Sequence, residues 1–219
     1  MFRFIAVIMS GAFVITACSS PTDSSSGAQP TPDLQTVRMI THESFVLSPS
    51  FVEDLLTQGI DLEITSTGDA GTLTASAILA AGQPTADLLF GIDNTLALRA
   101  TDENVFEPYT SPELTNLLPP FLQDTQDGRL TPIDFGDVCI NIDDTWFAEQ
   151  ATSAPANLEQ LPEVANLLVV QDPATSSPGL AFLLATVARF GDEWPAYWEA
   201  LRDGGVTVAG SWTDAYYTQ

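Results

Sequence analysis

The sequence predicts an α/β fold with mainly parallel sheets, because short apolar strands alternate with helices along most of the chain. Three strand–loop–helix units lie between residues 37 and 100, and a fourth begins at Leu167. A polar loop follows the strand in each unit. The carboxyl ends of parallel strands lie at one edge of a sheet, where folds of this kind bind ligands. We therefore expect these loops to form the functional site.

The first half of the chain carries three of these units. The first helix is expected to open at a Ser-x-x-Glu capping box, Ser50 to Glu53, and to end at Gly59. The expected strands are Val37–Ile40, Leu62–Thr65 and Ala86–Phe90. The second helix is expected over Leu73–Ala81, and the third is expected to end near Ala100. A further short helix is expected near Pro112–Leu118.

The fourth unit contains a strand, Leu167–Val170, a polar loop from Gln171 to Pro178, and a helix from Gly179. The loop places the hydroxyls of Thr175, Ser176 and Ser177 at a helix start. Unpaired N–H groups and the positive end of the helix dipole meet there, which suits an oxygen-rich or anionic group. Alternatively, this is an ordinary loop in which Ser177 caps a helix that begins at Pro178.

The remaining elements extend the same pattern. The sequence predicts an amphipathic helix over Trp194–Asp203 and a strand over Val206–Val208. A strand is also expected over Val138–Ile142, after a Pro-rich connection that ends at Asp134-Phe135-Gly136. This connection is either a crossing into a second lobe or a plain loop.

The charge of the chain limits its partners. It has 29 acidic and 6 basic residues, the latter all arginine, for a net charge of -23. Such a surface repels nucleic acids and anionic lipids and attracts a cationic ligand. Alternatively, the acidic surface only keeps the protein soluble and says nothing about a ligand. The 45% hydrophobic composition is enough to build a core.

The N-terminus has the anatomy of a signal peptide over residues 1–17, with a basic start and an apolar run from Phe4 to Val14. This run is shorter than the roughly 20 residues that span a bilayer. Ile15-Thr16-Ala17-Cys18 resembles a bacterial lipobox, which implies a lipid anchor on Cys18. Residues 18–36 form a flexible tether. Cys139, the other cysteine, is expected to be a small buried hydrophobe.

The chemistry of the side chains favours binding over catalysis. The single histidine, His42, lacks the partners of a zinc site or a nucleophile–base pair, so we expect neither a metal nor an enzyme. Asp143 and Asp144 are expected in a solvated turn. Carboxylates, hydroxyls and the late aromatics Trp212 and Tyr216 together suit a flat cationic heterocycle, unless the aromatics belong to the core.

Six segments resemble thiamine-binding proteins, the solute-binding components of bacterial ABC importers, in order and approximate spacing. The resemblance runs from Val37 to the last residue. The segments are Thr41–Phe45, Gly68–Gly71, Gly91–Asn94, Ile133–Gly136, Asp172–Leu180 and Gly210–Tyr216.

The resemblance implies a two-lobed, periplasmic-binding-protein-like fold, with a first lobe over 37–132 and a second over 133–219. It also implies that an exported, monomeric carrier captures thiamine or its phosphates, with no cofactor, and serves a permease and its ATPase. Thr175 to Ser177 would face the hydroxyethyl or phosphate arm. The acidic residues would bind the aminopyrimidine and balance the thiazolium, and the late aromatics would stack. The implied ligand-binding residues are His42, Glu43, Ser44, Gly68, Asp69, Asp93, Asn94, Thr175, Ser176, Ser177, Trp212 and Tyr216.

The chain also departs from this family. It has His42-Glu43 where the family often has Tyr-Asp, and no Trp between Val46 and Ser50. Family members continue beyond Tyr216, so we expect both lobes to be incomplete, apolar sheet edges to be exposed, and binding to be weak. Two other readings stay open. In the first, the same scaffold binds another small cargo, such as a polyamine, a metal-chelate or an organic anion. In the second, the chain is a cell-surface interaction module without a small ligand, whose polar loops do not converge.

Overall fold

The computed structural model describes residues 33–116 and 127–218, and confirms an α/β fold with parallel sheets. The expected signal peptide, the lipid anchor at Cys18 and most of the tether lie outside these residues. No helix in the two described ranges is long and apolar enough to cross a membrane.

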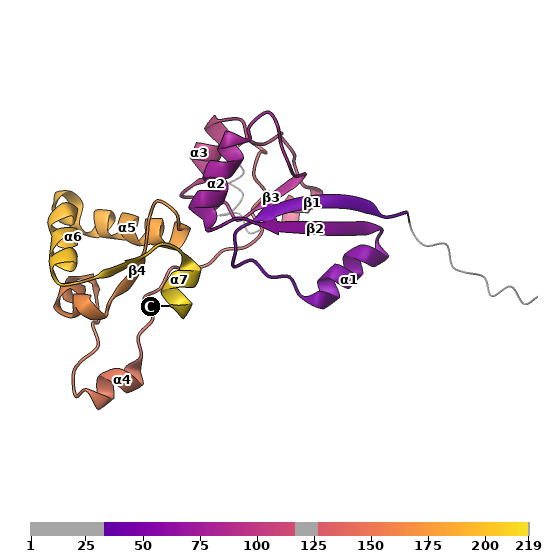
Figure 1. The fold of residues 1–219 in the computed structure, drawn as a ribbon. Coiled ribbons are helices and arrows are strands. Elements are labelled where there is room, and N and C mark those ends of the chain that lie inside the picture. Colours follow the sequence, from indigo (N-terminus) through magenta and orange to yellow (C-terminus); the bar gives the residue numbers. More distant parts are fainter. Residues whose placement is uncertain (1–32, 117–126, 219) are drawn as a thin grey trace, which may run out of the picture. The chain divides into compact units, whose positions relative to one another are not determined.

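The first sheet has three parallel strands in the order β2-β1-β3 (Figure 1). Strand β1, Gln35–Thr41, is central, and begins two residues before the expected Val37. It pairs with β2, Ile60–Ser66, through the register Val37–Leu62, and with β3, Leu88–Phe90, through Met39–Leu88. The three predicted strands are therefore confirmed, with shifted ends.

Helix α1, Pro49–Thr57, begins earlier than the sequence predicted. Its N-cap is Ser48, whose hydroxyl accepts a hydrogen bond from the Phe51 N–H at 3.3 Å, so the capping box at Ser50 is wrong. Pro49 explains the shift, because a proline at the first helical position has the right φ and lacks an N–H that would need a partner. Gly59, with φ of 84°, follows the helix end as expected.

Helix α2, Ala70–Leu79, also begins early, since Asp69 is its N-cap. Ala70 and Gly71 therefore form its first turn, where the sequence predicted a loop. Leu73 and Ala77 on this helix are buried with Met39 of β1 and with Leu96 and Ala100 around helix α3, Ala97–Asp102.

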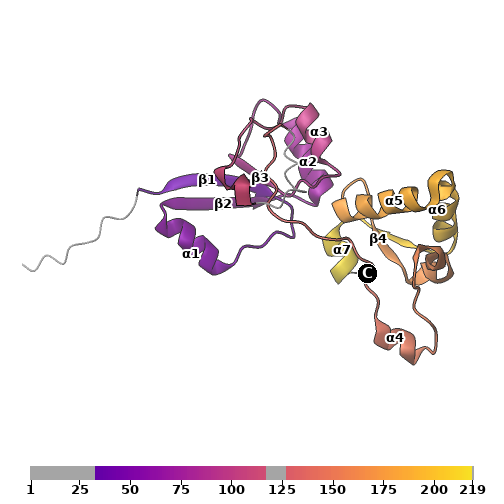
Figure 2. The ribbon, with the colours of Figure 1, turned by 180° about the vertical axis from the view of Figure 1, so that it is seen from behind.

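The second sheet consists of β4, Val169–Gln171, and β5, Thr207–Ala209, which are parallel. Helices α5, Ser177–Phe190, and α6, Trp194–Asp203, follow β4 (Figure 2). The bounds of α6 match the prediction. The core of this half consists of Leu161, Ala165, Leu168, Val170, Tyr197 and Leu201. Phe190 stacks on Tyr197 with a centroid distance of 4.2 Å.

Smaller elements complete the part of the chain that the structure describes. The helix expected near residues 112–118 is a 3-10 helix, η1, Pro112–Asn116, and its last two expected positions lie outside the described residues. The other elements are the 3-10 helices η3, Leu158–Leu167, and η4, Gly191–Glu193, and the helices α4, Asp144–Glu149, and α7, Trp212–Tyr217.

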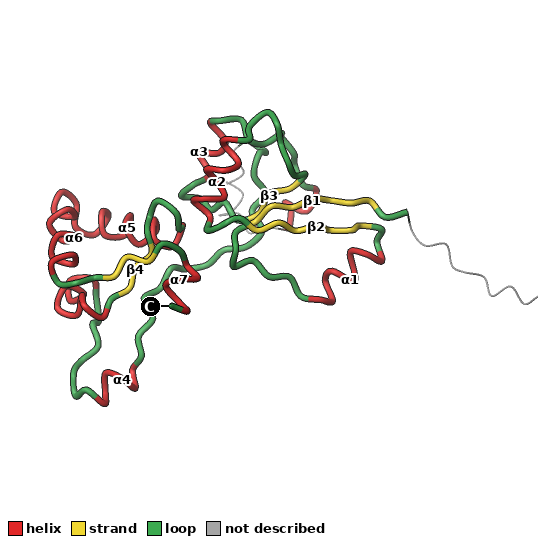
Figure 3. The backbone as a smooth tube through the Cα atoms, viewed as in Figure 1, coloured by secondary structure: helices red, strands yellow, loops and turns green. Residues whose placement is uncertain are grey.

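The strand predicted over Val138–Ile142 is wrong. Figure 3 shows this segment as loop, and none of the described strands pairs with it. Its apolar side chains are exposed, Val138 by 52% and Ile140 by 41%. An isolated strand without a sheet partner is not stable. Cys139 is likewise exposed, not buried. Asp143 accepts a hydrogen bond from the Trp146 N–H and caps α4, so the pair Asp143-Asp144 opens a helix instead of a turn.

Candidate functional site

Three loops from distant parts of the sequence meet through hydrogen bonds. The Gly71 N–H donates to the Thr175 carbonyl at 2.8 Å. The Thr175 hydroxyl donates to the Gly210 carbonyl at 2.9 Å, and the Trp212 N–H donates to Asp69 Oδ2 at 2.7 Å. The structure thus brings together three predicted site residues, Asp69, Thr175 and Trp212.

Gly71 is essential to this meeting because it lets two backbones approach closely. A Cβ at this position would lie 2.7 Å from the carbonyl oxygens of both Ala174 and Thr175. These atoms belong to the backbone and cannot rotate away. The first turn of α2 therefore reaches the loop before α5 only with glycine here.

The N-termini of α2 and α5 both belong to this group of loops. Asp69 caps α2 without a side-chain bond to its own helix, so its carboxylate is available to Trp212. Ser176 is the N-cap of α5, and Ser177 is its first residue, so the prediction that Ser177 is the cap is wrong. Pro178 then occupies the second position, which also needs no N–H partner. Ser176 is 1% exposed, and its hydroxyl contacts Gln171 Oε1.

The loop after β1 joins the same group. The Glu43 N–H donates to the Gly68 carbonyl at 2.8 Å, which ties this loop to the loop before α2. His42 Nδ1 lies 2.9 Å from the Ser44 hydroxyl. Glu43 and Ser44 are exposed, while His42 is half-buried. The carboxylate of Glu43 therefore faces solvent beside the Gly68–Asp69 turn.

His42 is held against the loop after β3. Gly91, with φ of 114°, leaves room for the imidazole, since a Cβ would lie 2.4 Å from His42 Cδ2. The rings of Phe45 and Phe90 pack on each other beside the imidazole, with 4.7 Å between the two phenyl centroids. The histidine is thus a fixed part of the loop surface.

Asp93 and Asn94 are less well connected to the site than predicted. Asp93 Oδ1 accepts hydrogen bonds from the Thr95 N–H, the Thr95 hydroxyl and the Leu96 N–H, at 3.0, 2.7 and 3.1 Å. This pattern closes the turn ahead of α3, so Asp93 has a local structural role. Asn94 is exposed.

Burial shifts the pKa of two ionisable groups in opposite directions. Burial raises the pKa of Asp69, an effect that the Trp212 N–H opposes and the Glu43 charge reinforces. Burial lowers the pKa of His42, against the charges of Asp69, Asp134 and Glu43. His42 is therefore neutral at pH 7, and the local charge is that of the carboxylates.

The two late aromatics form a stacked pair on α7. The rings of Trp212 and Tyr216 are 4.4 Å apart between centroids, with an interplanar angle of 21°. Tyr216 is 51% exposed, which excludes it from the core. The alternative that this tyrosine packs in the core is wrong. The pair instead offers an aromatic surface next to Asp69.

Two further residues of this region, Asn141 and Asp134, were not among the predicted ligand-binding residues. Asn141 Nδ2 donates to the Tyr216 hydroxyl at 2.6 Å, although it lies in a segment that looked like an ordinary strand. Asp134 contributes to the charge around His42 from the connection before that segment. Neither contact is local, so only the tertiary structure reveals them.

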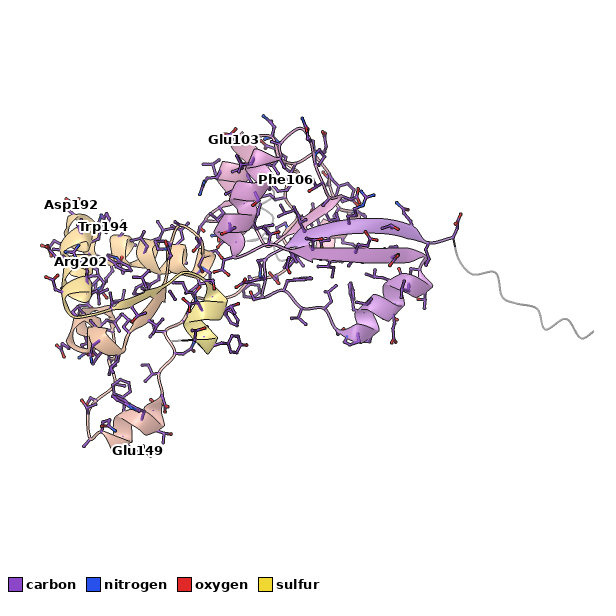
Figure 4. All side chains as sticks on the ribbon, in the orientation of Figure 1. Glu103, Phe106, Glu149, Asp192, Trp194 and Arg202 are labelled. Carbon is purple, nitrogen blue, oxygen red and sulfur yellow. The ribbon has the colours of Figure 1, made fainter. Side chains whose placement is uncertain are left out.

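The structure also contains a groove that these loops do not line. It has a volume of about 510 Å³, and Trp194 and Arg202 on its wall belong to α6 (Figure 4). None of the predicted site residues lines it. Within the described residues, no group of three His, Cys, Asp or Glu side chains is placed to hold a metal ion.

Known proteins resemble this chain in sequence and in fold. Residues 83–216 match the family model of bacterial extracellular solute-binding proteins. A thiamine-binding periplasmic protein of Brucella suis is 28% identical over 83% of this chain and 54% of its own length. The Escherichia coli protein of the same name is 30% identical over 60% of this chain and 38% of its own length.

A solved structure shows the same fold. A periplasmic thiamin binding protein superposes with a TM-score of 0.63 at 23% identity, over 84% of this chain and 57% of that one. The chain thus spans about half the length of the Brucella relative and of this structure.

Proposed function

Because this chain belongs to the family of bacterial extracellular solute-binding proteins, we propose that it captures thiamine or a thiamine phosphate and delivers it to the permease of an ABC importer. The names of its relatives support thiamine as the cargo. In this proposal the chain binds and releases its ligand unchanged and is not an enzyme.

The meeting of the loops supports the proposal most strongly. Hydrogen bonds join Asp69 to Trp212 and Gly71 to Thr175, across more than 100 positions of sequence in each case. A surface module without a small ligand would not require its strand-end loops to meet. A binding protein requires it, because several loops must contact one small molecule.

The chemistry of the joined loops suits the parts of thiamine. The exposed carboxylate of Glu43 and the buried one of Asp69 supply negative charge for a thiazolium cation. Trp212 and Tyr216 present an aromatic surface for a flat heterocycle. The start of α5 offers N–H groups and a positive dipole end to a hydroxyethyl or phosphate arm.

These features divide the proposed ligand contacts into two groups. Thr175, Ser176 and Ser177, with Gly68, would bind the arm. His42, Glu43, Ser44 and Asp69, with the two aromatics, would bind the rings. Asp93 and Asn94 are the weakest candidates, since the Asp93 carboxylate already closes its own turn.

The sequence and the relatives support an exported carrier. Both relatives are described as periplasmic, which supports export of this chain. We further propose a signal peptide over residues 1–17, a lipid anchor on Cys18, and a tether that leads to lobes over 37–132 and 133–219. The carrier acts as a monomer.

A ligand panel tests the proposal. The melting temperature of the full chain is measured with thiamine, thiamine monophosphate, thiamine diphosphate, spermidine and citrate. We expect the three thiamine compounds to raise it, because a ligand of the native state stabilises by mass action. A rise with spermidine or citrate alone would favour another cargo, and no rise with any compound would contradict the proposal.

A further inference from the structure

An exposed aromatic pair is held in place by a side chain from a distant segment. Tyr216 stacks on Trp212, yet 51% of the tyrosine is exposed, so the core does not fix its ring. Helix α7, which carries both rings, has only six residues. A short helix at the surface needs additional contacts to keep one orientation.

Asn141 provides such a contact. Its Nδ2 group lies 2.6 Å from the Tyr216 hydroxyl oxygen, across 75 positions of sequence. The amide donates this hydrogen bond, and the hydroxyl oxygen accepts it. The hydroxyl keeps its own hydrogen, which can be donated elsewhere. Because hydrogen bonds in a chain polarise one another, the contact also strengthens the hydroxyl as a donor.

The other end of α7 is fixed independently. The Trp212 N–H donates to Asp69 Oδ2, and the Ser211 hydroxyl accepts the Asp214 N–H at 3.0 Å. These bonds fix the backbone at the start of α7, and the phenol ring is held both by the stack on Trp212 and by Asn141. Together these contacts fix the direction in which the tyrosine hydroxyl points.

We propose that Asn141 is a positioning residue for ligand binding: it holds the Tyr216 ring on Trp212 and directs the phenol hydrogen towards an acceptor atom of the bound ligand. This inference rests on the proposed function. The acceptor would be a ring nitrogen of an aminopyrimidine or an oxygen of a phosphate arm. Asn141 itself does not touch the ligand.

A double-mutant cycle tests the assignment. The Kd for thiamine is measured by calorimetry for the full chain and for Asn141→Leu, Tyr216→Phe and the double variant. We expect Asn141→Leu to raise the Kd about twofold to tenfold, the usual range for one hydrogen bond. The double variant should bind no more weakly than Tyr216→Phe, because both changes remove the same bond. If the double variant lost the sum of the binding free energies lost in the two single variants, the proposal would be overturned.

Asn141→Asp separates positioning from a structural role. A carboxylate accepts the phenol hydrogen, so the contact and the stack persist while the hydrogen is turned away from the ligand. We expect thiamine affinity to fall in spite of the added negative charge, which by itself would attract a cation. Wild-type affinity in this variant would overturn the proposal. Cys139→Ser, an exposed change two residues away, is the control and should leave the Kd unchanged.

A ligand-free measurement keeps this test separate from the test of the cargo. The chain is labelled with 5-fluorotryptophan, and the Trp212 resonance is identified with Trp212→Phe. We expect Asn141→Leu to shift this resonance, and Asn141→Asp to leave it near its original position. If wild type fails to bind thiamine, the cargo proposal fails, while an unchanged resonance in Asn141→Leu overturns the role of Asn141 whatever the cargo is.

Discussion

Asp69 caps one helix and binds the first N–H of another that follows it by more than 140 positions in sequence. Its Oδ2 accepts a hydrogen bond from the Trp212 N–H at 2.7 Å. The side chain is 5% exposed, and burial raises the pKa of its carboxyl group. This single contact joins the loop after β2 to the start of α7, and with it the acidic and aromatic parts of the proposed site.

Replacing Asp69 separates its hydrogen bond from its charge. We expect Asp69→Asn to keep stability near wild type, since the amide oxygen still accepts the Trp212 N–H, while thiamine affinity falls. Asp69→Ala should lower the free energy of unfolding by about 1–3 kcal/mol, because a partly buried N–H loses its partner. Urea unfolding and calorimetry measure both effects. Equal stability loss in the two variants would contradict the role of the bond.

The pH dependence of stability provides a second test of Asp69. Its raised pKa means that the folded state binds the proton more tightly than the unfolded state. Stability should therefore decrease as pH rises from about 3.8 through the folded-state pKa. Asp69→Asn should lack this decrease. An identical pH profile in the variant would contradict the buried environment of this carboxyl group.

His42 should change stability with pH in the opposite direction to Asp69. Its pKa is lowered from 6.5, so the unfolded state binds the proton more tightly. The stabilising contribution is present above pH 6.5 and is lost as pH falls through the folded-state pKa. We expect His42→Gln to remove this component when unfolding is compared at pH 5 and 7.5. If His42→Gln lost as much stability as wild type between pH 7.5 and pH 5, His42 would not be the source of this pH dependence.

Gly71 tests the close approach of two backbones. Gly71→Ala would place a Cβ 2.7 Å from two carbonyl oxygens, so we expect a loss of about 1–3 kcal/mol in unfolding free energy and weaker binding. Gly136→Ala is a matched control, because no heavy atom lies within 4 Å of its added Cβ. Similar effects in both variants would show that the contact between α2 and the loop before α5 is unimportant.

The anchor is tested by membrane fractionation. We expect Cys18→Ser to release the chain from membranes, because the sulfur carries the proposed lipid. Cys139→Ser, which changes an exposed cysteine in the folded part, should leave the chain in the membrane fraction. Retention of the Cys18 variant would indicate an uncleaved apolar helix at the N-terminus.

The sequence predicted most of the sheet and helix order, because strand–loop–helix units have strong local patterns. Helix α6 was predicted to the residue, since Pro195 and the following glycines mark its ends. The helix starts were less accurate. At α1, Ser50 has a glutamate three residues later, but the N-cap is Ser48, which precedes a proline. At α5, Ser176 and Ser177 are adjacent.

The failures share a non-local cause. A strand was expected over Val138–Ile142, but a strand forms only where a partner pairs with it. The role of Asn141 depends on Tyr216, 75 positions away. The involvement of Asp69 and Thr175 was inferred from loop position and family resemblance, whereas their bonds to Trp212 and Gly71 required the structure.

Calorimetry on two tryptophan variants tests the central claim most directly. Trp212 belongs to the joined loops, and Trp194 lines the separate groove on α6. We predict that wild type binds thiamine at one site, that Trp212→Ala abolishes the binding heat, and that Trp194→Ala leaves the Kd unchanged. Binding that survives Trp212→Ala but is lost in Trp194→Ala would place the ligand elsewhere and contradict the account.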